Sequence, residues 1–129
     1  MSDRLPFTLW HDLLGLPFAE GARGPAAFDC VGVLFEMQRR LGRSIPDCAS
    51  NAELLADARR LWTRVTAPQP GDAVLLYSSE PLWHLGIVTD ISPKPWFLHA
   101  YPKTGVIRSR LDRFPWKNQI EGYYRWTQS

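Results

Sequence analysis

The sequence predicts a single α+β domain in which N-terminal helices precede, and pack on, a central antiparallel sheet of about five strands. The chain has 129 residues, which suits one domain of roughly 100–200 residues. Helical spacing of apolar residues dominates the first half, and short segments rich in β-branched and aromatic residues follow from Pro68. Their connections are too short for parallel crossovers, so the strands are expected to be antiparallel.

Composition and charge narrow the class of protein. The chain is 45% hydrophobic and 22% charged with a net charge of +2, which is typical of a globular domain. The densest basic cluster, Arg39, Arg40 and Arg43, lies at the end of a predicted helix, where cations complement the helix dipole. We therefore expect no nucleic-acid partner. No stretch approaches the roughly 20 apolar residues of a membrane-spanning helix.

The N-terminal segment and the cysteines indicate the compartment. Residues 1–15 interrupt their apolar run with polar residues and have no small-residue cleavage site, so they do not resemble a secretory signal. Synthesis in the cytoplasm is expected, and a reducing cytoplasm disfavours a disulfide between Cys30 and Cys48. Cys30 is then a candidate reactive thiol, and Cys48 has no comparable context.

The first half of the chain predicts a helix, a loop and a second helix. Residues 7–14 have apolar residues at helical spacing and end at Gly15. Residues 15–28 contain three glycines and two prolines, which indicates a shaped loop. Asp29 is a good N-cap for the next helix, which Gly42 ends. The apolar residues of that helix recur at helical spacing: Cys30, Val33, Leu34, Met37 and Leu41.

The second half predicts one more helix and then the sheet. Ser50 and Glu53 form a capping box that begins a helix reaching Leu61. Beyond the turn at residues 68–72, five short segments have the composition of strands: 73–77, 84–91, 96–101, 105–110 and 121–126.

Cys30 is the strongest local candidate for chemistry, because it directly follows the capping residue Asp29. A thiol at a helix N-terminus feels the positive end of the dipole, which lowers its pKa from about 8.5 and favours the nucleophilic thiolate. Helix-start amides can also stabilise an oxyanion. The alternative is a small core residue, because cysteine is among the most buried residue types.

Two of the three histidines, His84 and His99, fall in predicted strands of the same sheet. A thiolate nucleophile needs a base, and that base needs a third group to hold its tautomer. Cys30, His84 and His99 are the residues that would supply these parts. The same three side chains are also acceptable zinc ligands, which is a competing hypothesis. His11 lies in the first predicted helix and is interpreted as a surface residue.

Four blocks of the sequence, in order, resemble the NlpC family of papain-like cysteine peptidases. Residues 15–22 match the family's Gly-x-Pro-Tyr-x-x-Gly-Gly loop, and Asp29, Cys30 and Gly32 match its Asp-Cys-x-Gly motif. A Pro-Gly-Asp turn follows at residues 70–72. The remaining matches are the His-x-Gly-Ile pattern, with His84, Gly86 and Ile87, and the polar residue His99 on the next strand.

The resemblance implies a papain-like fold, with the Cys-bearing helix packed on the His-bearing sheet, and a role for each matched residue. Cys30 would be the nucleophile, His84 the general base and acid, and His99 the residue that orients His84. Together with Cys30, the substrate and oxyanion loop would include Phe18, Gly21 and Asp29. Family members usually cleave after D-glutamate in peptidoglycan stem peptides, so such a peptide is the expected substrate, with no cofactor and no metal.

The sequence departs from the family pattern at two positions, and two of its segments resemble one subgroup of the family. Phe18 replaces the loop tyrosine whose hydroxyl is thought to help stabilise the oxyanion, and Ala22 replaces the second glycine. Residues 28–47 and the closing Gly-Tyr-Tyr-Arg at 122–125 resemble members encoded in phage tail-assembly regions. The subgroup implies a place in the virion tail, with tail-tip proteins as partners and action at the periplasmic cell wall. The alternative function is a structural tail-tip or assembly protein that keeps the peptidase fold without full activity.

Overall fold

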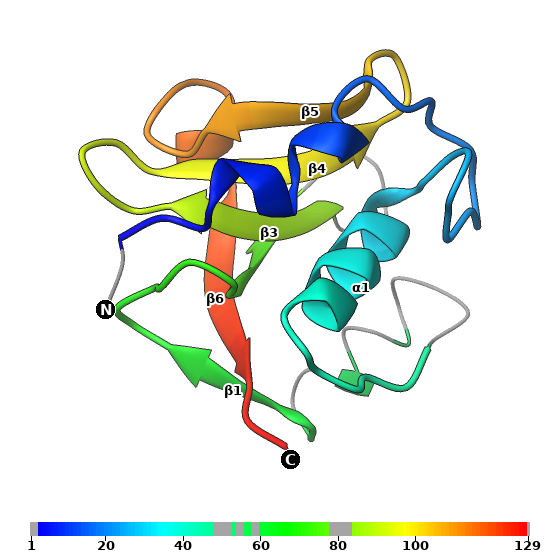
Figure 1. Ribbon diagram of the computed structural model, residues 1–129. Helices are drawn as coiled ribbons and strands as arrows, with labels where there is room; N and C mark the ends of the chain where they lie inside the picture. Colours follow the sequence, from blue (N-terminus) through cyan, green and yellow to red (C-terminus); the bar gives the residue numbers. More distant parts are fainter. Residues whose placement is uncertain (1–2, 48–52, 54–55, 58–59, 78–83, 129) are drawn as a thin grey trace.

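The computed structural model describes residues 3–47, 53, 56–57, 60–77 and 84–128. Helix α1 (Cys30–Arg40) packs on a six-stranded antiparallel sheet of order β1-β6-β2-β3-β4-β5 (Figure 1). The arrangement confirms the predicted α+β class. The strands are β1 (Trp62–Val65), β2 (Ala73–Leu76), β3 (His84–Asp90), β4 (Trp96–Tyr101), β5 (Gly105–Arg110) and β6 (Ile120–Trp126).

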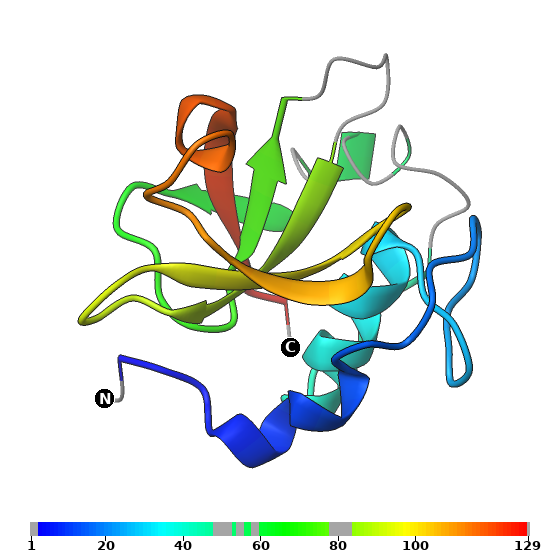
Figure 2. The same cartoon turned by 90° about the horizontal axis from the view of Figure 1, so that it is seen from above.

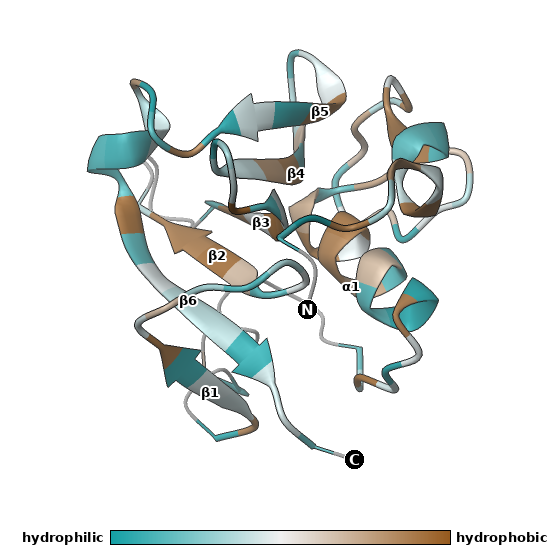
Figure 3. Ribbon diagram, turned by 60° about the vertical axis from the view of Figure 1, so that its left-hand side comes forward, coloured by the Kyte–Doolittle hydropathy of each residue, from teal (hydrophilic) through white to brown (hydrophobic). Residues whose placement is uncertain are grey.

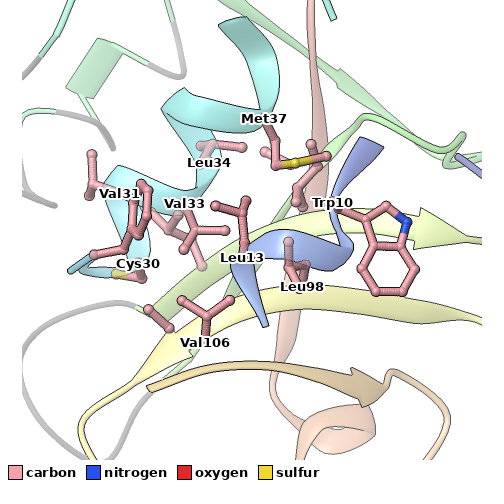
Figure 4. Close-up of a cluster of buried hydrophobic side chains, with 14 of the residues drawn as sticks. Trp10, Leu13, Cys30, Val31, Val33, Leu34, Met37, Leu98 and Val106 are labelled. Atoms are coloured by element: carbon pink, nitrogen blue, oxygen red, sulfur yellow. The ribbon is translucent and has the colours of Figure 1, made fainter. Parts of the chain in front are cut away.

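Helix α1 forms where the sequence predicts it. Asp29 caps its first turn by accepting a hydrogen bond from the Gly32 amide, and Gly42 follows its end with φ +82°. Its apolar face is buried against β3 and β4. Figure 4 shows this cluster, with Cys30 at one end and Trp10 at the other. The packing therefore places the first residue of α1 at one end of the core.

The sheet is apolar on both faces, because successive residues of a strand point to opposite sides. On β3 and β4, Leu85, Ile87, Leu98 and Ala100 belong to the cluster shared with α1. The alternate residues of the sheet form a second cluster on the other face, consisting of Val74, Leu76, Val88 and Phe97 with Leu111. Residues of β3 with even numbers and of β4 with odd numbers thus face away from α1.

Hydropathy follows this layered arrangement. In Figure 3 the strongly apolar segments lie on β2, β3, β4 and part of α1, whereas the last turn of α1 is hydrophilic. Within the described part of the chain, no helix combines the length and apolar character that crossing a bilayer requires.

The Pro-Gly-Asp turn ties the helix to the sheet. Asp72 is almost fully buried and accepts hydrogen bonds from the Gln69 amide at 2.7 Å and from the Arg125 guanidinium on β6 at 2.8 Å. On the other side, Gln38 of α1 donates to the Gly71 carbonyl at 2.8 Å. A buried carboxylate needs such partners to offset its desolvation, and here they join the turn to β6 while Gln38 joins it to α1.

All five predicted strands occur, and β4 and β5 have the predicted bounds. The sheet has six strands where about five were expected, and the strand that the sequence did not indicate is β1. Only Trp62 of β1 is buried, so the segment lacks the alternation that predicts a strand. It is an edge strand paired with β6, and Trp62 packs edge-on against Trp126 with ring centroids 5.4 Å apart.

The helical predictions are only partly matched. In place of one helix over residues 7–14, the structure has two short 3-10 helices, η1 (Phe7–Leu9) and η2 (His11–Leu13). Trp10, with φ −134° and ψ −11°, interrupts the helical path between them, and its side chain is buried in the core. The helix predicted over residues 50–61 lies mostly outside the described residues, as does Cys48.

Replacing Gly32 by Ala should destabilise the fold, because a Cβ at this position would lie 2.3 Å from the Ala22 carbonyl oxygen. That backbone atom cannot move without disturbing the loop that precedes α1. We expect a loss of about 1–3 kcal/mol in the free energy of unfolding, measured by urea denaturation. Arg39→Ala, on the exposed side of the same helix, is the control and should change stability by less than about 0.5 kcal/mol. Equal stability of the two variants would contradict the close contact.

Candidate active site

Cys30 is the first residue of α1 and is 7% exposed. Its side chain belongs to the core cluster between the helix and the sheet (Figure 4). The prediction that Cys30 begins a helix is confirmed, and its catalytic role remains a prediction. The position combines a largely desolvated thiol with the positive end of the helix dipole.

The carboxylate of Asp29 holds the loop that precedes Cys30. One oxygen accepts from the Gly32 amide at 2.7 Å and the other from the Gly21 amide at 3.0 Å. Arg23 donates to both oxygens, at 2.8 and 3.0 Å, and also to Asp47 at 3.0 Å. Asp29 and the Gly21 amide are thus bonded to each other. This geometry gives both a loop-holding role, and their predicted place in a substrate loop stays a prediction.

The same loop is tied to the far edge of the sheet. The Gly15 amide donates to the Val106 carbonyl and the Val106 amide to the Leu16 carbonyl, both at 2.9 Å. Gly105 has φ +74°, and a Cβ there would lie 2.3 Å from the Leu16 carbonyl oxygen, so glycine is required. Phe18 is half-buried and packs against the core cluster that contains Cys30. Its ring therefore has an apolar contact as well as an exposed part.

His84 and His99 are joined directly. Nε2 of His84 lies 2.7 Å from Nδ1 of His99, and Nε2 of His99 lies 2.9 Å from Oγ of Ser109. The two rings meet edge to face, with centroids 4.8 Å apart. Gly86 permits this approach, because a Cβ there would lie 2.6 Å from the Leu98 carbonyl oxygen and 3.0 Å from Cβ of His99. The glycine of the His-x-Gly motif therefore allows the histidine-bearing strands to come together.

The histidines lie on the sheet face opposite the one that packs on α1, as their positions in β3 and β4 require. His84 is nevertheless the first residue of β3, and the first turn of α1 lies toward the end of the sheet where β3 begins (Figures 1 and 2). α1 also packs directly on both β3 and β4. Cys30, at the start of α1, and His84, at the start of β3, thus lie toward the same end of the sheet.

Aromatic side chains enclose the histidine pair. Trp116, in the short helix η3 (Trp116–Asn118), lies 5.4 Å from His84 and 5.0 Å from His99 between ring centroids. Tyr101 lies edge-on to His84 at 5.7 Å, and Phe97 stacks on His99 at 4.1 Å. His99 is fully buried and His84 half-buried. This enclosure shields His99 fully from solvent and leaves part of His84 accessible.

Burial determines the charge of the pair. It lowers the pKa of His84 from 6.5 to about 4. Burial, and secondarily the neighbouring His84, lower the pKa of His99 further. Both imidazoles are therefore neutral at neutral pH. Each has one N–H and one lone pair, so His84 can accept a proton, as a general base must.

The structure also bears on the hypothesis that Cys30, His84 and His99 bind a zinc ion. Over residues 3–47, 53, 56–57, 60–77 and 84–128, no group of three or more His, Cys, Asp or Glu side chains is arranged to hold one. Nε2 of His84 and Nδ1 of His99 face each other in a hydrogen bond, and a shared ligand role would require both to face a common ion.

The sequence analysis did not identify three neighbours of the histidines. Tyr101 shares a face of β4 with His99, so alternation along the strand could have identified it. Ser109 reaches His99 through the pairing of β4 with β5, and the register of that pairing cannot be predicted from the sequence of either strand alone. Trp116 lies outside the strands, and no local pattern connects it with His84.

Comparison with known proteins identifies relatives of this arrangement. The model of the NlpC/P60 family matches residues 15–125. No curated protein matches the sequence. Among solved structures, a lipoprotein-like NLP/P60 protein of Staphylococcus aureus superimposes with a TM-score of 0.73 at 21% identity, over 95% of this chain and 40% of that protein. NlpC1 of Trichomonas vaginalis gives 0.70 at 20% identity, over 94% of this chain and 43% of that one.

A third structure has the length of this chain. The NlpC/p60 domain of the peptidoglycan hydrolase SagA superimposes with a TM-score of 0.62 at 18% identity, over 94% of both chains. This chain thus spans less than half of the Staphylococcus and Trichomonas proteins but nearly all of the isolated SagA domain. At these identities the three structures show a common fold.

Stability should fall as the pH drops from about 6.5 to about 4. An unfolded histidine binds its proton near pH 6.5, whereas folded His84 does so only near pH 4. The unfolded chain therefore binds more protons in this interval, and protonation favours unfolding. We expect a loss of about 1–3 kcal/mol in the free energy of unfolding, measured by urea denaturation at several pH values. A wild-type curve that stays flat over the interval, or a His84→Gln/His99→Gln variant with the wild-type slope, would contradict it.

Proposed function

The chain belongs to the NlpC/P60 family, since the family model covers residues 15–125, and we propose that it is a cysteine endopeptidase acting on the stem peptides of bacterial peptidoglycan. The observation that carries the proposal is the hydrogen-bonded pair of His84 and His99, in which His84 is the first residue of β3. Helix α1, with Cys30 as its first residue, begins near the same end of β3 (Figure 1). The fold shared with the domain of a peptidoglycan hydrolase supports the same substrate class. Fold alone does not determine a reaction, so the proposal rests on the site.

The geometry suggests a definite assignment of protons. Nε2 of His84 is hydrogen-bonded to His99, so Nδ1 is the nitrogen that can take the thiol proton. Cys30 would then attack the carbonyl carbon of the peptide bond, forming a C–S bond. His84 would return its proton to the leaving amine as the C–N bond breaks. Water, deprotonated by His84, would hydrolyse the thioester and regenerate the thiol.

The transition state requires stabilisation of the developing oxyanion. The first amides of α1, other than that of Gly32, which donates to Asp29, point out of its N-terminal end, where the positive end of the dipole lies. In this proposal they stabilise the oxyanion, since Phe18 has no hydroxyl to donate and the Gly21 amide donates to Asp29. The bond cleaved would be the one after D-glutamate, as is usual in the family.

The biological setting is a further part of the proposal and rests on sequence form alone. Residues 28–47 and 122–125 resemble members encoded in phage tail-assembly regions. A domain in such a tail would be made in the cytoplasm, contact tail-tip proteins and reach the cell wall during infection. Detection of the chain by mass spectrometry in purified virions, and its absence from tail-less particles, is the measurement that tests this setting.

Phe18 favours one competing function, a structural protein that keeps the fold. The family's tyrosine hydroxyl is missing at this position, and the Phe18 ring packs partly against the core. A protein selected only for assembly would need the loop and the core but no oxyanion donor. Activity of the purified wild-type chain on peptidoglycan separates the two functions.

Cys30→Ala should abolish release of peptide fragments from purified peptidoglycan sacculi, because it removes the covalent step. The fold should persist, since the change removes one sulfur at a helix start. Cys48→Ala is the matched control and should keep activity near the wild-type level. His84→Ala should be nearly as inactive as Cys30→Ala, because the thiol then lacks its base. Fragments identified by mass spectrometry would also reveal the bond cleaved.

Two results would contradict this assignment. Release of fragments by Cys30→Ala, or an equal loss of activity in Cys48→Ala, would place the nucleophile elsewhere. Inactivity of the wild-type chain, together with slow and equal alkylation of both thiols by iodoacetamide at neutral pH, would favour the structural function.

Phe18→Tyr should raise kcat with little change in KM, because it restores a hydroxyl that can stabilise the oxyanion in the transition state. Loss of one such donor in other enzymes costs about a hundred- to a thousand-fold in kcat. We expect a gain of about tenfold, since an added donor lacks optimised support. Phe18 is half-buried, so the hydroxyl should be solvated and Tm unchanged. A lower Tm with unchanged kcat would show that Phe18 acts only in packing.

A further inference from the structure

Ser109 contacts the histidine pair at the end away from His84. Its Oγ lies 2.9 Å from Nε2 of His99, and Nδ1 of His99 lies 2.7 Å from Nε2 of His84. These contacts form a continuous chain of hydrogen bonds from β3 through β4 to β5. Neither the sequence motifs nor the family resemblance includes Ser109.

Strand register explains how Ser109 reaches His99. In the antiparallel pair of β4 and β5, His99 lies opposite Ile107 and Phe97 lies opposite Ser109. His99 and Ser109 are therefore diagonal neighbours on one face of the sheet, which is within reach of a long ring and a hydroxyl. The contact depends on regular pairing and not on a flexible loop.

The chain of hydrogen bonds can run in two directions, because a neutral imidazole has one N–H and one lone pair. In one direction His84 donates from Nε2 to His99, and His99 donates from Nε2 to Ser109. The lone pair of His84 is then on Nδ1. In the reverse direction Ser109 donates to His99 and His99 donates to His84, which leaves a proton on Nδ1 of His84. Only the first direction leaves Nδ1 of His84 able to accept the thiol proton.

We propose that Ser109 is a positioning residue: by accepting from the Nε2–H of His99 it allows the proton of His99 to stay on Nε2, which leaves Nδ1 of His84 available as the base. The proposal deepens the proposed function and rests on it, because only a catalytic His84 requires this tautomer. Ser109 itself touches neither substrate nor thiol in this role. It acts through His99.

The surroundings of His99 explain why a hydroxyl is needed at position 109. His99 is fully buried, so an N–H without an acceptor would have a desolvation cost. Phe97 stacks on the ring and Trp116 meets it edge to face, and neither offers a strong acceptor to Nε2. With an apolar residue at position 109, the tautomer of His99 with its proton on Nδ1 becomes the more stable one, because Nε2 of His84 can accept a hydrogen bond from Nδ1 while Nε2 of His99 has no acceptor. His84 would then carry its own proton on Nδ1 and lose its function as a base.

The test begins with the resting protein and needs no substrate. In ¹⁵N-labelled wild-type protein at neutral pH, nitrogen chemical shifts distinguish a protonated ring nitrogen from one with a lone pair. We expect both His84 and His99 to have their protons on Nε2. In Ser109→Ala we expect His99 to shift toward the Nδ1–H form, and His84 to follow. Ser109→Thr keeps the hydroxyl and should restore the wild-type pattern.

Kinetics on peptidoglycan fragments supply the second measurement. Ser109→Ala should lower kcat by about tenfold with KM little changed, because it alters the state of the base and not the binding of substrate. Ser109→Thr should recover most of kcat. Thr63→Ala removes a hydroxyl from β1, at the opposite side of the sheet, and serves as the control with unchanged kcat.

Three outcomes would overturn the proposal: a wild-type His99 with its proton on Nδ1, wild-type tautomers in Ser109→Ala, or a kcat of Ser109→Ala equal to that of Thr63→Ala. Its failure is distinguishable from failure of the proposed function. A wild-type chain with the expected tautomers but no hydrolysis would leave the role of Ser109 in the tautomer intact and refute the peptidase.

Discussion

The carboxylate of Asp29 is the group on which the geometry around Cys30 depends. It caps α1 through the Gly32 amide, fastens the loop through the Gly21 amide and pairs with Arg23. These bonds connect the first turn of the helix to the segment before it, and Gly32 lets the two backbones come within contact distance. A carboxylate that accepts hydrogen bonds from several donors loses little free energy when it is partly buried, because the donors replace the water it gives up. Asp29 can therefore hold the helix start rigidly next to the core.

The geometry of the site depends secondly on the different surroundings of the two faces of the sheet. One face buries α1, and the other face carries the histidines together with an aromatic cluster. Burial within that cluster keeps His84 neutral at neutral pH, with its pKa lowered to about 4. A neutral imidazole is the state that can accept a proton from a thiol. The described hydrogen bonds of the His99 ring are those with His84 and Ser109. The three side chains thus form a chain of hydrogen bonds whose donors and acceptors can be arranged in two opposite directions.

Much of the fold was predictable from local patterns. Asp29 and Gly42 bound α1 because caps are short-range signals, and β4 and β5 have their predicted bounds because alternation and turn residues lie within a few positions of each other. β1 was missed, since an edge strand with one buried residue has no alternation. Residues 7–14 form two 3-10 turns because burying Trp10 in the core outweighs the helical pattern. The histidine pair was expected as a pair, but not its contacts.

The sequence by itself determined which residue types stand where chemistry is possible: a thiol directly after a helix cap, and two imidazoles on neighbouring strands. These features are local, and the spacing of the motifs suffices to find them. Only the tertiary structure decided that His84 and His99 face away from α1, that Trp116 and Tyr101 enclose them, and that Ser109 ends their chain of hydrogen bonds. Such contacts join residues far apart in the chain. They follow from strand register and from the position of η3 beside the histidines, and no single segment encodes either.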